Sequence, residues 1–136
     1  MSGSPPGEVA PPEIRPLSGR LEAIDGYDLA AGLRNVGGQL PTLSRVLREF
    51  VRNYRAGEPA FLSPNTHDAV QRWNDQCHSM RGACATIGAT RLQAQLAEFE
   101  LALAASGDAP ALVSRAQQLS ADLVALAGRL GEELER

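Results

Sequence analysis

The segment from residue 112 to residue 130 most restricts how this chain can fold. Its apolar residues return at alternating steps of four and three, which is the spacing of one face of an α-helix. A helix with one apolar face is stable only when that face packs against other elements. The segment therefore predicts a long amphipathic helix that belongs to a multi-helix core. The residues of this face are Leu112, Ala116, Leu119, Leu123, Leu126 and Leu130.

Three earlier segments show the same spacing, and no segment alternates apolar and polar residues as a strand would. Helices are expected over residues 40–56, from residue 63 to about 87, and over 90–105, with glycines at 57, 88 and 107 ending them. A composition rich in Ala and Leu and poor in aromatic residues also favours helices. Their inward positions are predicted to be Leu40, Leu43, Leu47, Phe50 and Tyr54; Val70, Trp73, Cys77, Cys84 and Ile87; and Leu92, Leu96, Phe99 and Leu103.

Short connections between these long helices favour an all-α fold, an antiparallel up-and-down four-helix bundle. A short helix from Asp28 to Asn35, ended by Gly37 and Gly38, is expected to cover the bundle near its N-terminus. Residues 1–22 contain five prolines and no periodicity, which predicts a flexible tail or linker and places the domain at residues 23–136. Further helix starts are predicted at Pro41, Ser63-Pro64 and Asp108.

Length and charge limit the possible function classes. A chain of 136 residues is long enough for one compact domain. The net charge is −3 with acidic and basic residues interspersed, so no nucleic-acid surface is expected. No apolar run approaches the roughly 20 residues that span a bilayer, and no secretory signal is evident, which predicts a cytoplasmic location without membrane contact. No Gly-rich nucleotide loop is visible, so the chain is not expected to be an ATP-using enzyme.

His78 lies one residue after Cys77 and therefore roughly 100° away from the apolar face of its helix. This position puts the imidazole at the edge of the core, where a partner molecule can reach it. Arg81 and Gly82 follow at spacings of three and four residues, so all three share one helix face. Glycine inside a helix costs about 1 kcal/mol relative to alanine. A reachable histidine beside a cation and a costly glycine indicates close approach by another molecule.

The stretch from His78 to Leu92 resembles the signature of the histidine phosphotransfer (HPt) family. That signature runs approximately His-x-x-Lys-Gly, two small residues, an apolar-Gly pair and a leucine, and Ile87-Gly88 supplies the pair here. The resemblance covers about residues 24–134 and is greatest to the HPt modules of bacterial hybrid sensor histidine kinases. Arg81 departs from the pattern, because a planar guanidinium replaces the usual compact lysine ammonium. Further matching positions are Ile24 to Leu33, Leu43, Leu47, Phe50, Leu96, Phe99 and Glu100.

The resemblance implies a phosphocarrier of a two-component phosphorelay. His78 would accept a phosphoryl group from a receiver aspartate and pass it to another receiver aspartate. Arg81 would offset the phosphoryl charge, and Gly82 would leave room for the receiver's loops. Glu100, one residue past the inward Phe99, is expected to accept a hydrogen bond from Nδ1 of His78 so that Nε2 can attack. The implied partners are receiver domains and a hybrid sensor kinase, with no cofactor in this chain and magnesium bound by the receiver.

Two other function classes stay open. The dimerisation and phosphoacceptor module of a histidine kinase usually has an acidic residue just after its histidine and a proline a few residues later, where this chain has Ser79 and Ala83. The other class is a helical interaction bundle without phosphorylation. Because one chain supplies enough helices for a closed core, a monomer is expected. Three apolar residues of the short N-terminal segment are either core residues or a docking patch: Tyr27, Leu29 and Leu33.

Cys77 and Cys84 are seven residues apart on one helix, so their Cα atoms are expected about 10 Å apart. A disulfide requires less than about 7 Å, and both residues are therefore interpreted as small core side chains. The same spacing disfavours a zinc site formed by these cysteines and His78. The second histidine, His67, lies about 16 Å along the helix from His78 and cannot share its site.

Overall fold

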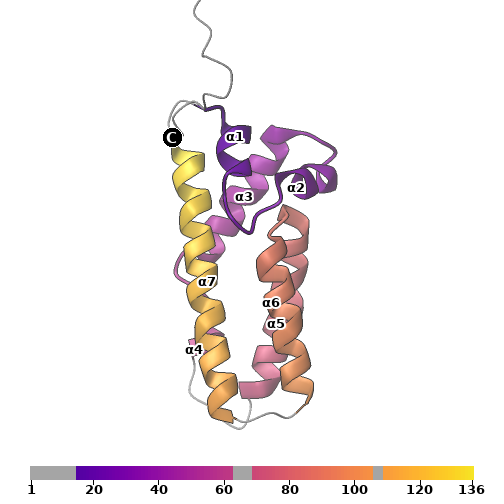
Figure 1. Cartoon of the computed structure of the whole chain (residues 1–136), viewed down its shortest axis with the longest axis vertical. Coiled ribbons are helices and arrows are strands. Elements are labelled where there is room, and N and C mark those ends of the chain that lie inside the picture. The colour runs from indigo at the N-terminus through magenta and orange to yellow at the C-terminus, as the bar shows by residue number, and fades with distance from the viewer. Residues whose placement is uncertain (1–14, 63–68, 106–108) are drawn as a thin grey trace, which may run out of the picture.

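The computed structural model describes residues 15–62, 69–105 and 109–136, and within these ranges the chain forms helices and no strand (Figure 1). The prediction of an all-α fold is confirmed. The helices in chain order are α1 (Leu17–Glu22), α2 (Leu29–Asn35), α3 (Leu40–Tyr54), α4 (Pro59–Leu62), α5 (Ala69–Ile87), α6 (Thr90–Ala104) and α7 (Ala109–Glu135).

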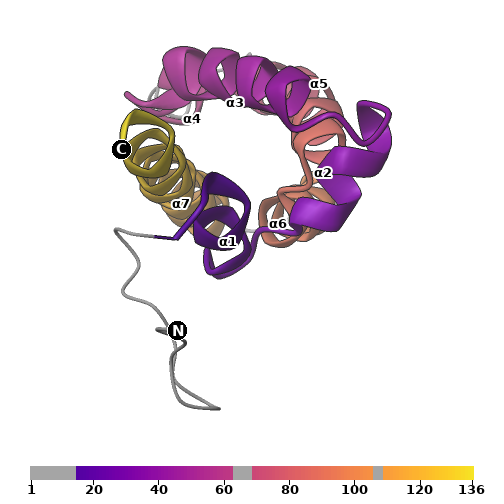
Figure 2. The same ribbon diagram turned by 90° about the horizontal axis from the view of Figure 1, so that it is seen from above.

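The four long helices α3, α5, α6 and α7 lie side by side around one apolar core (Figure 2). Helix α5 packs along α6, α6 along α7, and α3 against both α7 and α5. At one end of this bundle α1 contacts α7, and α2 contacts α5. The most completely buried core residues include Leu43, Leu47, Phe61, Trp73, Cys77, Met80, Ile87, Leu96, Phe99, Leu123 and Leu130.

The turn between α5 and α6 is where glycine is required, as the sequence predicted for residue 88. Gly88 has a φ of +89°, and a Cβ atom there would lie 2.2 Å from the carbonyl oxygen of Asp28. The Gly88 carbonyl accepts a hydrogen bond from the Asp28 backbone N–H at 2.8 Å. Asp28 also caps α2, because its Oδ1 accepts a hydrogen bond from the Ala31 N–H at 3.1 Å. The turn therefore joins α2 to the end of α5.

The flexible tail predicted over residues 1–22 is wrong for residues 17–22, which form α1. Leu21 of this helix has no exposed surface. The Arg20 guanidinium lies 3.2 Å from the carboxylate of Glu133 on α7 and donates to the Glu133 carbonyl at 2.9 Å. Six residues are too few to display a helical period, and Pro16 directly before them makes the segment resemble a linker. Residues 1–14 lie outside the described residues.

Helix α4 was also not predicted, because four residues carry no periodic signal. Its Phe61 is buried edge-on against the ring of Phe99 with centroids 6.1 Å apart, and its Ala60 carbonyl accepts a hydrogen bond from Trp73 Nε1 at 2.7 Å. Val70, predicted to point inward, is 42% exposed because it lies in the first turn of α5. The predicted helix starts at residues 63–64 and 108 lie outside the described residues.

Candidate functional site

Helix α5 presents His78 to solvent, while the residue before it and the residue two positions after it are buried in the core. Cys77 and Met80 are buried, whereas His78 is exposed, as its offset from the apolar face predicts. The His78 side chain makes no hydrogen bond or ion pair within the described residues. Its ring is therefore open to a molecule that approaches from outside.

Gly82 stands on the same face of α5 and borders open space. A Cβ atom at this position would meet nothing within 4 Å. The Gly82 carbonyl accepts a hydrogen bond from Thr86 Oγ1 at 3.0 Å. Packing within the described chain therefore gives no reason for a glycine in mid-helix, and any longer side chain would occupy the space beside His78.

Arg81 and Glu100 form an ion pair across the contact between α5 and α6. Arg81 Nη1 lies 3.2 Å from Glu100 Oε2, with the two side chains 37% and 20% exposed. The other carboxylate oxygen, Oε1, is buried and has no hydrogen-bond partner among the described residues. The sequence predicted a direct hydrogen bond from His78 to Glu100, but among the described residues Glu100 pairs with Arg81 and His78 forms no hydrogen bond. Glu100 instead contacts the residue one turn beyond His78, because the long guanidinium reaches across to α6.

The two thiols lie beneath this surface and are free. Burial raises the pKa of Cys77 to about 12; the nearby Glu100 carboxylate adds to this increase, and Arg81 opposes it. Burial likewise raises the pKa of Cys84 to about 12. Both residues are therefore protonated core side chains at neutral pH, and a thiolate nucleophile is not available at this site.

Helix α2 is held directly against the C-terminal turn of α5. Asn35 Nδ2 donates hydrogen bonds to the carbonyls of Ala85 and Thr86, at 2.9 and 3.2 Å. A Cβ atom on Gly32 would lie 2.4 Å from the Ile87 carbonyl oxygen, so the two backbones touch. The sequence did not reveal these contacts, since neither an exposed asparagine nor a helical glycine identifies its partner. Of the suggested docking residues, Tyr27 and Leu29 are buried in the core, and only Leu33 is half-buried.

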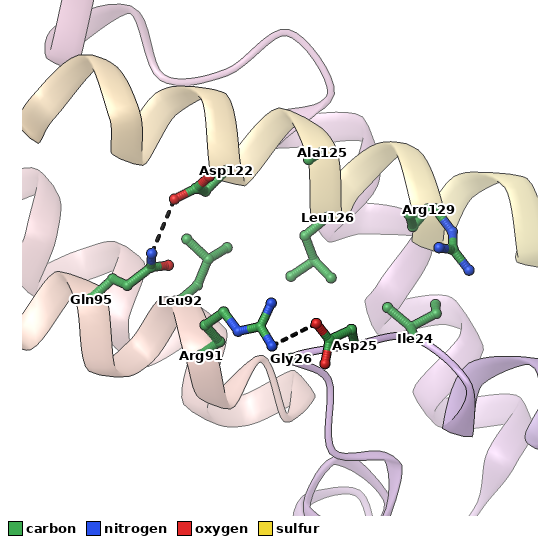
Figure 3. A pocket seen from close by; sticks show the side chains of 10 residues that line it. All are labelled: Ile24, Asp25, Gly26, Arg91, Leu92, Gln95, Asp122, Ala125, Leu126 and Arg129. Carbon is green, nitrogen blue, oxygen red and sulfur yellow. Dashed lines mark hydrogen bonds and ion pairs between the residues drawn. The ribbon is translucent and has the colours of Figure 1, made fainter.

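A separate pocket of about 320 Å³ lies between the loop before α2, α6 and α7 (Figure 3). Arg91 crosses it to pair with Asp25 at 2.7 Å, and Gln95 donates to Asp122 at 3.0 Å. None of the four predicted site residues lines this pocket. In the described ranges no three metal-binding side chains gather into a site, and no helix there is long and apolar enough to cross a membrane. His67 lies outside the described residues.

A family model of the Hpt domain matches residues 33–135 of this chain. The matched range contains α3 to α7 and all four predicted site residues, His78, Arg81, Gly82 and Glu100. No curated protein and no solved structure matches the chain. Hpt domains are phosphocarrier modules of two-component phosphorelays that interact with receiver domains, and they are not enzymes. Because the match spans more than half of the sequence, the chain belongs to the Hpt domain family.

Proposed function

We propose that His78 is the phosphoacceptor of this domain and carries a phosphoryl group from one receiver aspartate to another. The observation that supports this role is the exposure of His78 on α5, next to the core face and beside the open space at Gly82. A hybrid sensor kinase is the proposed upstream source of the group. The domain needs no cofactor of its own, since the receiver's carboxylates bind the magnesium ion that assists transfer.

The chemical step is a displacement at phosphorus. The lone pair of Nε2 attacks the phosphorus of the aspartyl phosphate, the bond from phosphorus to the carboxylate oxygen breaks, and an N–P bond forms. The carboxylate leaves with the bonding electrons, and Nδ1 keeps its proton. The phosphorylated ring is then cationic, and a carboxylate near Nδ1 would stabilise it. Transfer to the second receiver reverses these steps.

Glu100 is proposed to have two successive partners. In the resting protein it pairs with Arg81 at 3.2 Å. When a phosphoryl group arrives on His78, the Arg81 guanidinium turns to its oxygens, because a dianionic group attracts the cation more strongly than one carboxylate does. Glu100 is then available to accept the hydrogen bond from Nδ1, and its Oε1 already lacks a partner among the described residues. The resting ion pair therefore keeps both side chains close to His78.

The fold proposed to carry this chemistry is an antiparallel up-and-down four-helix bundle that works as a monomer in the cytoplasm. The packing of α3, α5, α6 and α7 around one core supports it, because their apolar faces are satisfied within a single chain. A kinase dimerisation module would need a second chain to complete its bundle. A sedimentation mass of one chain at micromolar concentration is the expected result, and a mass of two chains would favour the kinase module.

The test is phosphoryl transfer from phosphorylated receiver domains of the source organism to the full chain. The wild type should gain acid-labile, alkali-stable phosphate, and His78→Ala should gain none while keeping its helical content. His67→Ala is the matched control, because it removes the other histidine of the chain and should leave phosphorylation unchanged. Phosphate retained by a folded His78→Ala protein would refute the assignment.

A further inference from the structure

Helix α3 and the residue that caps its C-terminus carry a row of four arginines that the proposed phosphotransfer does not use. They are spaced three, four and three residues apart, which places them within about 80° of one another around the helix and along about 15 Å of its length. All four are exposed. The row is called here the α3 arginine stripe and consists of Arg45, Arg48, Arg52 and Arg55.

No residue of the stripe forms an ion pair within the described part of the chain. Arg48 Nη2 donates a hydrogen bond of 3.4 Å to the Leu134 carbonyl. Elsewhere the structure pairs arginine with carboxylate repeatedly, as in Arg20 with Glu133 and Arg91 with Asp25. The chain as a whole has a net charge of −3, so the stripe is not part of a general basic excess. Its cations are available to an external anion.

A groove of about 200 Å³ runs beside the stripe between α3 and α7. Three stripe arginines line it together with the apolar side chains of Val51 and Leu134, with Gly131 and with one acidic residue, Glu135. A Cβ atom on Gly131 would come within 3.2 Å of a Val51 methyl group, so glycine at this position leaves the groove open. The groove thus offers an apolar floor and a rim on which three arginines outnumber one glutamate.

The groove beside the stripe lies between α3 and α7, whereas His78 is on α5. Seen from above, the contact between α3 and α7 and the contact between α5 and α6 occupy opposite sides of the ring of helices (Figure 2). Arg81 and Glu100 mark the α5–α6 side. A molecule bound at the stripe therefore leaves His78 accessible to a receiver.

We propose that the α3 arginine stripe and its groove bind an acidic helical segment of a partner protein. Guanidinium groups pair with carboxylates through two parallel hydrogen bonds, and a helix with acidic residues three and four apart matches the spacing of the stripe. An apolar side chain on such a helix would enter the groove. Membranes and nucleic acids are less suitable, because they are extended polyanions that a narrow stripe on a negatively charged molecule attracts only weakly. This binding is independent of phosphotransfer and would tether a relay partner.

The experiment uses the full chain and a synthetic 18-residue helical peptide with glutamates at the stripe spacing and leucines on the adjacent positions. Binding is measured by fluorescence anisotropy and mapped by amide chemical shifts. Arg45→Glu/Arg52→Glu should weaken binding at least about tenfold. The control Arg34→Glu/Arg115→Glu makes the same change in net charge on other helices and should weaken binding less than about threefold. A peptide with glutamine in place of glutamate should not bind.

Three results would overturn the proposal: equal weakening by the two variants, peptide shifts that map to α5 and α6, or no binding of the acidic peptide. Phosphatidylglycerol vesicles and a DNA duplex are tested in parallel, and tighter stripe-dependent binding of either would assign the surface to that ligand class instead. Phosphorylation of His78 by phosphoramidate is measured in the wild type and in both variants. A wild type that is not phosphorylated would count against His78 as the phosphoacceptor and not against the stripe.

Discussion

Arg81 Nη1 and Glu100 Oε2 lie 3.2 Å apart, and Arg81 follows His78 by three residues on α5. If Arg81 moves to the phosphoryl group during transfer, the guanidinium acts on the transition state more than on the fold. Arg81→Ala should therefore slow transfer by about tenfold or more, and Arg81→Lys should retain most of the rate.

The free energy of unfolding of the same variants separates a role of Arg81 in transfer from a role in holding the fold together. The pair is partly exposed and screened by solvent, so Arg81→Ala should lower the free energy of unfolding by less than about 1 kcal/mol, measured by urea denaturation. Arg115→Ala is the control. Arg115 on α7 lies 3.9 Å from Glu98 on α6, and its replacement should change neither the transfer rate nor the free energy of unfolding. Equal transfer rates for wild type and Arg81→Ala would make Arg81 an ordinary surface residue.

Gly82 allows a test of space beside His78. A Cβ atom there meets nothing within 4 Å, so Gly82→Ala should stabilise the protein by up to about 1 kcal/mol through helix propensity. Gly82→Gln should stay folded but slow transfer, because the longer side chain obstructs the receiver. Gly128 on α7 is a matched control, since a Cβ atom there also meets nothing within 4 Å. Normal transfer by a folded Gly82→Gln protein would disprove the steric argument.

At the scale of helices, α1 depends on its contacts with α7. Leu21 has no exposed surface, and its truncation to alanine should lower the free energy of unfolding by about 2–5 kcal/mol. Leu101→Ala on α6 is the control, because Leu101 is 72% exposed and its truncation should cost less than about 0.5 kcal/mol. Thermal or urea unfolding measures both. A Leu21→Ala protein as stable as the wild type would mean that α1 contributes little to the fold.

How much of the structure the sequence could predict depends on element length. The long helices repeat their apolar period several times, and their ends lie at glycines such as Gly57 and Gly88, with φ of +85° and +89°. Helices α1 and α4 are too short to repeat a period, and their stability comes from distant partners such as Glu133. The sequence placed His78, Arg81 and Gly82 on one face because helix geometry fixes it. It could not predict that Glu100 contacts Arg81, because that choice depends on side-chain conformations across two helices.

At the scale of the whole molecule, the buried thiols should make the free energy of unfolding decrease at alkaline pH. In the unfolded chain a cysteine titrates near pH 8.5, whereas burial raises the pKa of Cys77 and Cys84 to about 12 in the fold. The unfolded state therefore loses these protons first. Their contribution to stability is fully present below about pH 8.5 and is lost as pH rises toward 12. Urea unfolding at pH 8 and at pH 10.5 should show this loss.

A cysteine-free variant provides the control for that measurement. Cys77→Ala/Cys84→Ala should have a shallower decrease of stability with pH, whatever its absolute stability. Burial also raises the pKa of Tyr27 and of Tyr54, but both tyrosines are kept in this variant, so their effect cancels in the comparison. An identical pH dependence in the two proteins would show that the thiols are not the titrating groups.

The contact of Arg20 with Glu133 brings the first described helix beside the end of the last one (Figure 1). Residues near the two ends of the described chain are therefore close in space. The two ends can be joined and the chain opened at another point without separating any pair of packed helices. A circular permutant would join residue 136 to residue 15 through a short glycine linker and begin at Gly38. Gly37 and Gly38 are suitable for the new ends, because both are exposed and a Cβ atom at either meets nothing within 4 Å. In such a chain helix α5 and His78 would lie in the first half of the sequence instead of near its middle, with every helix contact retained.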